Sequence, residues 1–260
     1  MRPIHRLAVA VCIAIVCAVR ADICAAELVD TIARIKLSVV MIGTYQPLGS
    51  PQFNLLGTGF VVGDGRTVAT NAHVVGQIPP GEATTLVVVV AGASTSATEQ
   101  QVRKSRVWKL DSVHDLALLK FDGPALPSLG LKDSDTVREG TSVAFAGFPL
   151  GNVIGFVPVT HRGMISAITP IALPSANSRQ LSPTTIRRLN AGAFNIFQID
   201  GTAYPGNSGG PMFDVESGDV VGVINMVFVK GSKEAALAHP SGISYAIPAN
   251  FLRDLLNERP

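Results

Sequence analysis

Cysteine is missing from most of this chain of 260 residues: Cys12, Cys17 and Cys24 all lie before residue 27. Charge is also scarce, since Asp, Glu, Lys and Arg together make up 15% of the residues, with 21 basic and 19 acidic side chains. This balance lacks the basic excess expected of a nucleic-acid-binding protein. The chain is nevertheless 47% hydrophobic, so it can bury a substantial core and is not mostly disordered.

The amino-terminal segment has the three parts of a secretory signal peptide. Arg2 and Arg6 flank the start of an uncharged run of 13 residues, Leu7–Val19, and small residues follow. A membrane-spanning helix needs about 20 apolar residues, and no second such run follows, so we expect no stable membrane span after cleavage. We predict a signal peptide over residues 1–26, with cleavage after Ala21 or an uncleaved anchor as the alternatives.

Removal of this leader changes the composition of the chain. Residues 1–26 hold three basic side chains and one acidic side chain, so 18 of each sign remain, together with no cysteine. An exported protein without disulfides suits a bacterial cell envelope, although oxidising compartments do not require disulfides. We therefore expect an exported, periplasmic protein, with secretion as the alternative, and no nucleic-acid partner.

Short runs rich in Val and Ile, separated by Gly, Pro, Asp and Ser, dominate the rest of the sequence. About a dozen such runs with almost no helical periodicity between them predict an all-β barrel or sandwich. An amphipathic stretch over Glu27–Lys36 precedes them, a helix over Ala249–Asn257 closes the chain, and Pro170–Gly192 is predicted to be a long surface loop. The predicted strands are Ser38–Ile42, Gly59–Val62, Thr67–Thr70, Thr85–Ala91, Val102–Trp108, Leu116–Phe121, Ser142–Ala146, Met164–Thr169, Phe194–Ile199, Pro211–Val215, Val220–Val229 and Ile243–Ile247.

The segment Gly206–Pro211 reads Gly-Asn-Ser-Gly-Gly-Pro. A serine hydroxyl becomes a useful nucleophile when a base takes its proton and backbone N–H groups hold the developing oxyanion, and flexible glycines let the backbone present those groups. The same residue types also build ordinary turns. Ser208 is therefore a candidate nucleophile, with a plain turn as the alternative.

Two further residues stand where a β scaffold can aim a polar side chain. His73 follows the predicted strand Thr67–Thr70, and Asp115 immediately precedes an apolar strand. A buried carboxylate that accepts the Nδ1–H of an imidazole fixes its tautomer and stabilises the imidazolium formed during reaction. Each residue alone has an ordinary explanation, because a lone histidine is more often structural and Asp commonly begins strands as a turn residue. The other histidines, predicted to be structural or on the surface, are His5, His114, His161 and His239.

The order of the candidates along the chain connects them. His73, Asp115 and Ser208 follow the order of chymotrypsin, whereas subtilisin and the α/β-hydrolases use other orders. Together with the all-β pattern, this order makes the chain resemble chymotrypsin-fold serine proteases, and among them the bacterial Deg/HtrA type. The resemblance covers roughly residues 38–256 and rests on the motifs Gly57–Val62, Thr70–Val75, Asp115–Lys120, Gly147–Gly151, Asp200, Pro205–Pro211 and Gly242–Pro248.

The resemblance implies one trypsin-like protease domain over residues 27–260. Its fold is expected to be two packed six-stranded antiparallel β-barrels, of about residues 27–130 and 131–260, with a short C-terminal helix. Asn207 stands where digestive relatives carry an Asp that binds a newly cut amino terminus, so no activating cut is expected. Nine residues follow Phe251, so we expect none of the PDZ domains that many Deg/HtrA proteins carry, and the oligomeric state stays open.

The resemblance also implies a catalytic site. His73 and Asp115 come from the first barrel and Ser208 from the second, and the backbone N–H groups of Gly206 and Ser208 form the oxyanion hole. No metal or organic cofactor is expected, since the sequence offers no Cys/His ligand cluster.

By analogy, five uncharged residues form the pocket for the side chain before the scissile bond. Such a pocket favours small or medium aliphatic side chains, and an extended polypeptide pairs beside it as an additional strand. The five residues are Thr202, Ile224, Asn225, Met226 and Gly242, and the pocket is expected to extend over Val223–Met226 and Gly242–Ser244.

We therefore expect a serine endopeptidase that hydrolyses extended or unfolded polypeptides through an acyl-enzyme, in envelope protein quality control. Two alternatives stay open. One is a protease-fold binding or chaperone-like module with a resting, inactive site, and the other is an esterase that uses the same three residues.

Overall fold

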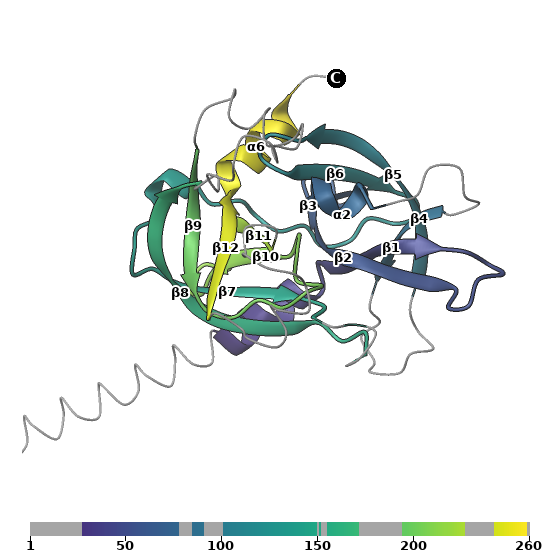
Figure 1. The fold of residues 1–260 in the computed structure, drawn as a ribbon, viewed down its shortest axis with the longest axis horizontal. Coiled ribbons are helices and arrows are strands. Elements are labelled where there is room, and N and C mark those ends of the chain that lie inside the picture. The colour runs from purple at the N-terminus through teal and green to yellow at the C-terminus, as the bar shows by residue number, and fades with distance from the viewer. Residues whose placement is uncertain are drawn as a thin grey trace, which may run out of the picture.

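The computed structural model describes residues 28–77, 85–90, 101–149, 151, 155–171, 194–226 and 242–258. Within these ranges twelve strands form two closed barrels of six strands each, and all neighbouring strands are antiparallel (Figure 1). The predicted fold class is confirmed. The expected signal peptide and most of the expected loop after Pro170 lie outside the described residues.

The first barrel closes in the order β1-β2-β3-β6-β5-β4. Its strands are β1 (Val39–Tyr45), β2 (Phe53–Val62), β3 (Thr67–Asn71), β4 (Thr85–Val90), β5 (Gln101–Asp111) and β6 (Leu116–Phe121).

The second barrel closes in the order β10-β11-β12-β9-β8-β7. Its strands are β7 (Ser142–Gly147), β8 (Val159–Pro170), β9 (Asn195–Asp200), β10 (Pro211–Asp214), β11 (Val220–Asn225) and β12 (Ile243–Pro248).

Every predicted strand is present, and the largest differences concern where β2 and β8 begin. β2 begins at Phe53 rather than Gly59, because Gly57 continues the strand instead of ending a turn. A Cβ at Gly57 would lie 2.9 Å from Val74 Cγ2, so glycine lets β2 pass close to its neighbour. β8 begins at Val159, ahead of the predicted start at Met164. The prediction missed these first residues because most of them are polar and partly exposed, so they lack the apolar pattern of a buried strand.

Three clusters of buried apolar side chains hold the fold together. One cluster contains only residues from the first barrel and its connections, and a second contains only residues from the second barrel and its connections. The third joins both barrels to the C-terminal helix and includes Phe60, Phe148 and Leu252. Burying one large apolar side chain contributes about 1.5–3 kcal/mol, so this third cluster is what packs the barrels against each other.

The helix α6 (Ala249–Asn257) follows β12 and also reaches the first barrel (Figure 1). Leu252 and Leu255 bury its apolar face, as the sequence pattern predicts. Lys109 of β5 donates to Leu255 O at 2.9 Å and to Leu256 O at 3.3 Å, which places a cation at the carboxyl end of the helix. The helix is therefore a second connection between the two barrels.

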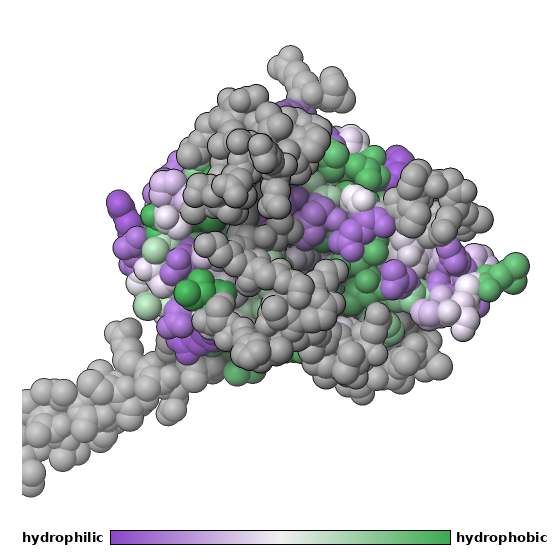
Figure 2. Space-filling model, viewed as in Figure 1, coloured by the Kyte–Doolittle hydropathy of each residue, from purple (hydrophilic) through white to green (hydrophobic). Residues whose placement is uncertain are grey.

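The expected amphipathic stretch forms a helix over residues 28–36. Among the residues whose structure is described, no helix combines the length and apolar character needed to cross a membrane. Figure 2 shows hydrophilic and apolar residues interspersed over both barrels, as is usual for a water-exposed surface. At the tip of the β1–β2 hairpin, the apolar side chain of Leu48 is fully exposed.

Candidate active site

His73 is held at the edge of the first barrel by a single helical turn. This turn, α2 (Ala72–Val75), follows β3 directly, and Val74 and Val75 bury its apolar side in the first-barrel core. The His73 side chain itself is 25% exposed. The backbone that carries the imidazole is thus held in place while one edge of the ring stays accessible to solvent. A general base needs both properties.

The Asp115 carboxylate accepts hydrogen bonds from both barrels. His73 contributes its backbone N–H, 2.8 Å from Asp115 Oδ1, and its ring Nδ1, 2.7 Å from Asp115 Oδ2. Asn225 Nδ2 donates to the same Oδ2 at 2.7 Å. Since an ionised carboxylate only accepts, this network assigns the ring proton of His73 to Nδ1 and leaves Nε2 free to take a proton.

The backbone of Asp115 adopts the left-handed conformation, with φ of +56°. Among the described residues it is the only non-glycine residue with a positive φ. Two groups hold its carbonyl, because Ala72 N–H donates to Asp115 O at 3.0 Å and Asn71 Nδ2 donates to it at 3.1 Å. Such conformations cost about 1–3 kcal/mol and cluster at functional sites.

Glycines shape the loop that carries Ser208. Gly209 has φ of +85°, and a Cβ there would lie 2.2 Å from both Thr58 O and Thr70 Oγ1. No other residue type fits this conformation and this space. The Ser208 carbonyl accepts the Thr58 N–H at 2.9 Å, so the loop of the second barrel is bonded directly to β2 of the first.

The two N–H groups predicted to form the oxyanion hole have no partner within the described part of the chain. The backbone N–H groups of Gly206 and Ser208 donate to none of these residues, whereas that of Asn207 is bonded. Thr58 Oγ1 donates to Gly206 O at 2.6 Å and accepts the Phe148 N–H at 3.0 Å. Thr58 thereby fixes the carbonyl of Gly206 and leaves two N–H groups available for an anionic oxygen.

The Ser208 hydroxyl lies beside the end of β11. Its Oγ accepts the Met226 N–H at 3.4 Å, and no hydrogen bond joins it to His73 in the described structure. Catalytic hydrogen bonds often tighten only in the complex with substrate. Asn225 and Met226, which are consecutive, thus contact the Asp115 carboxylate and the Ser208 hydroxyl, so the end of β11 brings the three candidates together.

Three of the predicted substrate-binding residues lie at this strand end. Ile224 is fully buried, its N–H donates to Gly210 O, and its carbonyl accepts the Gly209 N–H, both at 2.9 Å. The Asn225 side chain is also buried and bonds to the acid. Both residues therefore have contacts inside the site, and direct contact of Ile224, Asn225 and Met226 with substrate stays a prediction.

The other two predicted substrate-binding residues, Thr202 and Gly242, lie on segments that are bonded to each other, since the Gly201 N–H donates to Gly242 O at 3.0 Å. Ser244 Oγ accepts the Ala203 N–H and donates to Gly201 O, both at 2.7 Å. A Cβ on Gly242 would meet no atom of the described residues within 4 Å.

Sequence reasoning assigned Asn225 and Ser244 to the substrate pocket and gave Thr58 and Asn71 no role, so it missed the positioning contacts that the side chains of Thr58, Asn71, Asn225 and Ser244 make. All four side chains are buried and polar. Asn225 ends an otherwise apolar run, and a buried polar group needs a hydrogen-bond partner. That interruption was a usable signal, although it does not reveal the partner.

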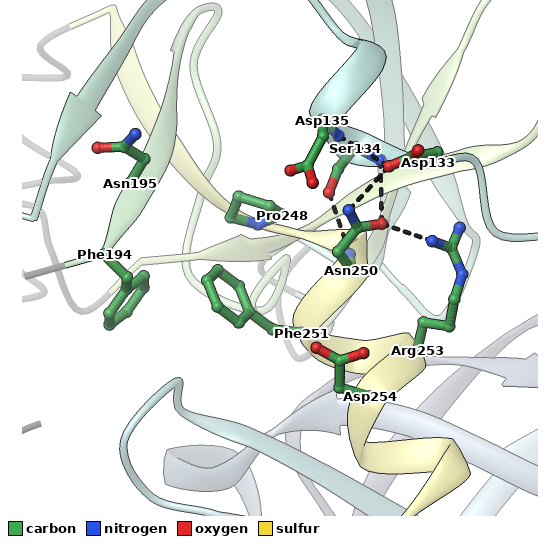
Figure 3. Close-up of a pocket in the computed structure, with 10 residues that line it drawn as sticks. All are labelled: Asp133, Ser134, Asp135, Phe194, Asn195, Pro248, Asn250, Phe251, Arg253 and Asp254. Carbon is green, nitrogen blue, oxygen red and sulfur yellow. Dashed lines mark hydrogen bonds between the residues drawn. The ribbon is translucent and has the colours of Figure 1, made fainter.

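A cavity of about 570 Å³ lies apart from these residues. It is lined by the turn η2 (Ser134–Thr136), the start of β9 and the helix α6 (Figure 3). None of the predicted site residues lines it. In the described ranges no three His, Cys, Asp or Glu side chains cluster as metal ligands.

The family model described as a trypsin-like peptidase domain matches residues 57–223. The probable periplasmic DegP-like serine endoproteases of Halomonas elongata and of a Marinomonas species are 30% identical over 210 residues and 29% identical over 219 residues. These matches cover 78% and 83% of this chain but 35% and 38% of the relatives.

The chain thus spans little more than a third of the length of these curated relatives. Among solved structures, the HtrA-type protease AlgW with a decapeptide is similar in fold, with a TM-score of 0.61 and 24% identity. That match covers 88% of this chain and 66% of the other.

Proposed function

The chain belongs to the family of trypsin-like peptidase domains, and from this membership we propose that it is a serine endopeptidase of the Deg/HtrA type. It hydrolyses peptide bonds in extended or unfolded polypeptides. The relatives that it matches are named periplasmic, and we extend that location, with a role in envelope protein quality control, to this chain as part of the proposal.

One observation carries the proposal. The Asp115 carboxylate is 4% exposed and lies 2.7 Å from His73 Nδ1, while the N–H groups of Gly206 and Ser208 have no hydrogen-bond partner among the described residues. A buried acid, an imidazole with a free Nε2 and an oxyanion-binding loop are the three elements of acyl transfer by a serine nucleophile.

In the proposed mechanism, His73 Nε2 takes the proton of Ser208 Oγ as that oxygen bonds to the peptide carbonyl carbon. The negative charge develops on the carbonyl oxygen and is held by the N–H groups of Gly206 and Ser208. Asp115 stabilises the imidazolium without taking its proton. His73 then gives the proton to the leaving amine, the C–N bond breaks, and water releases the acyl group from Ser208 by the same steps.

Formation of this arrangement requires the Ser208 hydroxyl to leave the Met226 N–H and turn toward His73. A neutral hydrogen bond contributes about 0.5–1.5 kcal/mol net, and this one is long at 3.4 Å. The free energy needed to rotate the Ser208 side chain is therefore small compared with the binding free energy that a substrate provides.

The proposed substrate is an extended chain with a small or medium aliphatic side chain before the scissile bond. Thr202 and Gly242 carry no charge, and within the described part of the chain no atom lies within 4 Å of a Cβ built on Gly242. An uncharged pocket gives a Lys or Arg side chain no acidic partner. Profiling of cleavage sites in an unfolded protein mixture tests this preference, and cuts confined to Lys and Arg would contradict it.

The test of the activity is labelling with a fluorophosphonate together with cleavage of an unfolded protein. We expect wild type to be labelled and to degrade the protein, and Ser208→Ala to do neither while it keeps the thermal unfolding of wild type. If wild type cleaves small esters in a Ser208-dependent manner but never cuts an unfolded chain, the site serves as an esterase.

A second function is favoured by one specific contact, the hydrogen bond from Met226 N–H to Ser208 Oγ. A serine hydroxyl that is bonded to the Met226 N–H, with no hydrogen bond to His73 in the described structure, suits a polypeptide-binding module with a resting site. That module would bind an unfolded chain without labelling by the fluorophosphonate under any condition, which separates it from the protease.

A further inference from the structure

His114 stands immediately before Asp115, and its side chain takes no part in the proposed chemistry. We propose that it is a positioning residue: its ring, held between the first barrel and α6, anchors the backbone turn that aims the Asp115 carboxylate at His73. The inference deepens the proposed function and rests on it for the role of Asp115 as the catalytic acid.

Asp111 holds one side of the His114 ring. The turn between β5 and β6 begins at Asp111, whose Oδ2 lies 2.5 Å from His114 Nδ1. Its Oδ1 accepts the backbone N–H groups of Val113 at 2.9 Å and His114 at 3.0 Å. Burial raises the pKa of Asp111, but the His114 ring and these N–H groups outweigh burial and hold the pKa below its usual value. The carboxylate therefore stays ionised and keeps the turn closed.

Two phenylalanine rings hold the other side. Phe251 of α6 stacks on His114 with ring centroids 4.0 Å apart and an angle of 18° between the rings. Phe194, directly before β9, meets the His114 ring at 4.7 Å and 65°, and the two phenylalanines pack edge to face at 5.2 Å. Both phenylalanines also line the cavity of Figure 3. The three rings thus join the turn before the acid to α6 and to the start of β9.

The effect on the acid is transmitted through the backbone. The left-handed conformation of Asp115 is unfavourable for a residue with a side chain, so it persists only where its surroundings hold it. Asn71 and Ala72 hold the Asp115 carbonyl. The contacts of the His114 ring hold the backbone of His114, the residue directly before Asp115. Without the ring contacts, φ of Asp115 relaxes toward negative values and the carboxylate moves away from His73 Nδ1.

The test compares variants of the full chain: His114→Ala, His114→Phe, Phe251→Ala and Phe251→Tyr. Leu256→Ala is the matched control, because Leu256 also lies on α6 and is partly buried in the core but has no ring to contact His114. Four quantities are measured for each protein: kcat and KM on a peptide ester, the thermal unfolding temperature, and the low-field proton resonance of His73 Nδ1–H in water.

We expect His114→Ala and Phe251→Ala to lower kcat roughly 10- to 100-fold with KM nearly unchanged, since a small misplacement of a catalytic group has an effect of this size. Their low-field resonance is shifted or lost. Phe251→Tyr keeps the ring and retains the wild-type kcat and resonance. His114→Phe keeps the ring stack and loses only the side-chain contact with Asp111, so we expect its kcat to lie between those of wild type and His114→Ala. This variant tests the inference even if His114→Ala does not fold. Leu256→Ala lowers the unfolding temperature alone.

The failure of this inference is distinct from the failure of the proposed function. If wild type is active and His114→Ala and Phe251→Ala keep its kcat and its low-field resonance, His114 is a packing residue and the inference is wrong. If wild type neither cleaves nor is labelled, the proposed function is wrong, and the resonance decides by itself whether His114 positions Asp115.

Discussion

Asn225 Nδ2 donates a hydrogen bond of 2.7 Å to Asp115 Oδ2, the oxygen that also contacts His73 Nδ1. Asn225 ends β11 of the second barrel and Asp115 precedes β6 of the first, and both are buried. The hydrogen bonds to the proposed catalytic carboxylate are therefore complete only when the two barrels pack against each other. This relationship makes the arrangement of the site depend on the interface that the shared core and α6 stabilise.

Asn225→Ala tests that contact. A hydrogen bond to a charged group contributes about 1.5–3 kcal/mol, so we expect steady-state kinetics to show kcat/KM reduced roughly 10- to 100-fold through kcat. Asn225→Ser keeps a donor and is expected to recover part of the loss. A rise in KM with an unchanged kcat would instead assign Asn225 to the substrate pocket.

Thr58→Val removes a hydroxyl while keeping the shape of the side chain. The Gly206 carbonyl loses its donor and the buried Phe148 N–H loses its acceptor. We expect a loss of stability of about 1–3 kcal/mol and slower fluorophosphonate labelling, because the backbone between the Gly206 and Ser208 N–H groups is held less firmly. Thr58→Ser, which keeps the hydroxyl, is the control. If Thr58→Val were labelled as fast as Thr58→Ser, the prediction would be wrong.

Gly209→Ala is expected to abolish stable folding, since its Cβ would overlap Thr58 O and Thr70 Oγ1 and its φ is +85°. Gly63 is the matched control, with φ of +60° and no atom of the described residues within 4 Å of an added Cβ. Gly63→Ala therefore has only the backbone penalty of about 1–2 kcal/mol. Urea denaturation of both variants measures the difference, and equal destabilisation would show that the contacts of Gly209 are unimportant.

His161 gives a pH dependence of stability. It is half-buried against Phe145, its Nε2 has no hydrogen-bond partner in the described structure, and burial lowers its pKa below the usual 6.5. The unfolded chain then binds the proton more readily, so this contribution is constant above about pH 6.5 and destabilises the fold as the pH falls below it.

The variant His161→Phe cannot take up this proton. We expect its free energy of unfolding to parallel that of wild type above about pH 6.5 and to fall less steeply below it. Denaturation curves recorded across this range measure the effect. Parallel curves down to acidic pH would show that His161 does not contribute.

Local patterns were sufficient for the strands and for α6. Apolar runs such as Leu116–Phe121 and the Gly, Pro and Asp residues between them depend on neighbours in sequence, so β6 and α6 were predicted with their observed bounds. The start of β8 was missed because its polar first half lacks that pattern. The turn α2 was missed because its four residues are too few to show helical periodicity.

The candidates His73, Asp115 and Ser208 could also be identified from residue types and order, because each stands in a short motif whose chemistry is local. The parts played by Asn225 and His114 could not. Asn225 meets Asp115 across 110 residues of sequence, and His114 meets Phe251 only because α6 folds back from the second barrel onto the first. Packing of two separate barrels decides such contacts, and no pattern along one segment contains the position of the other.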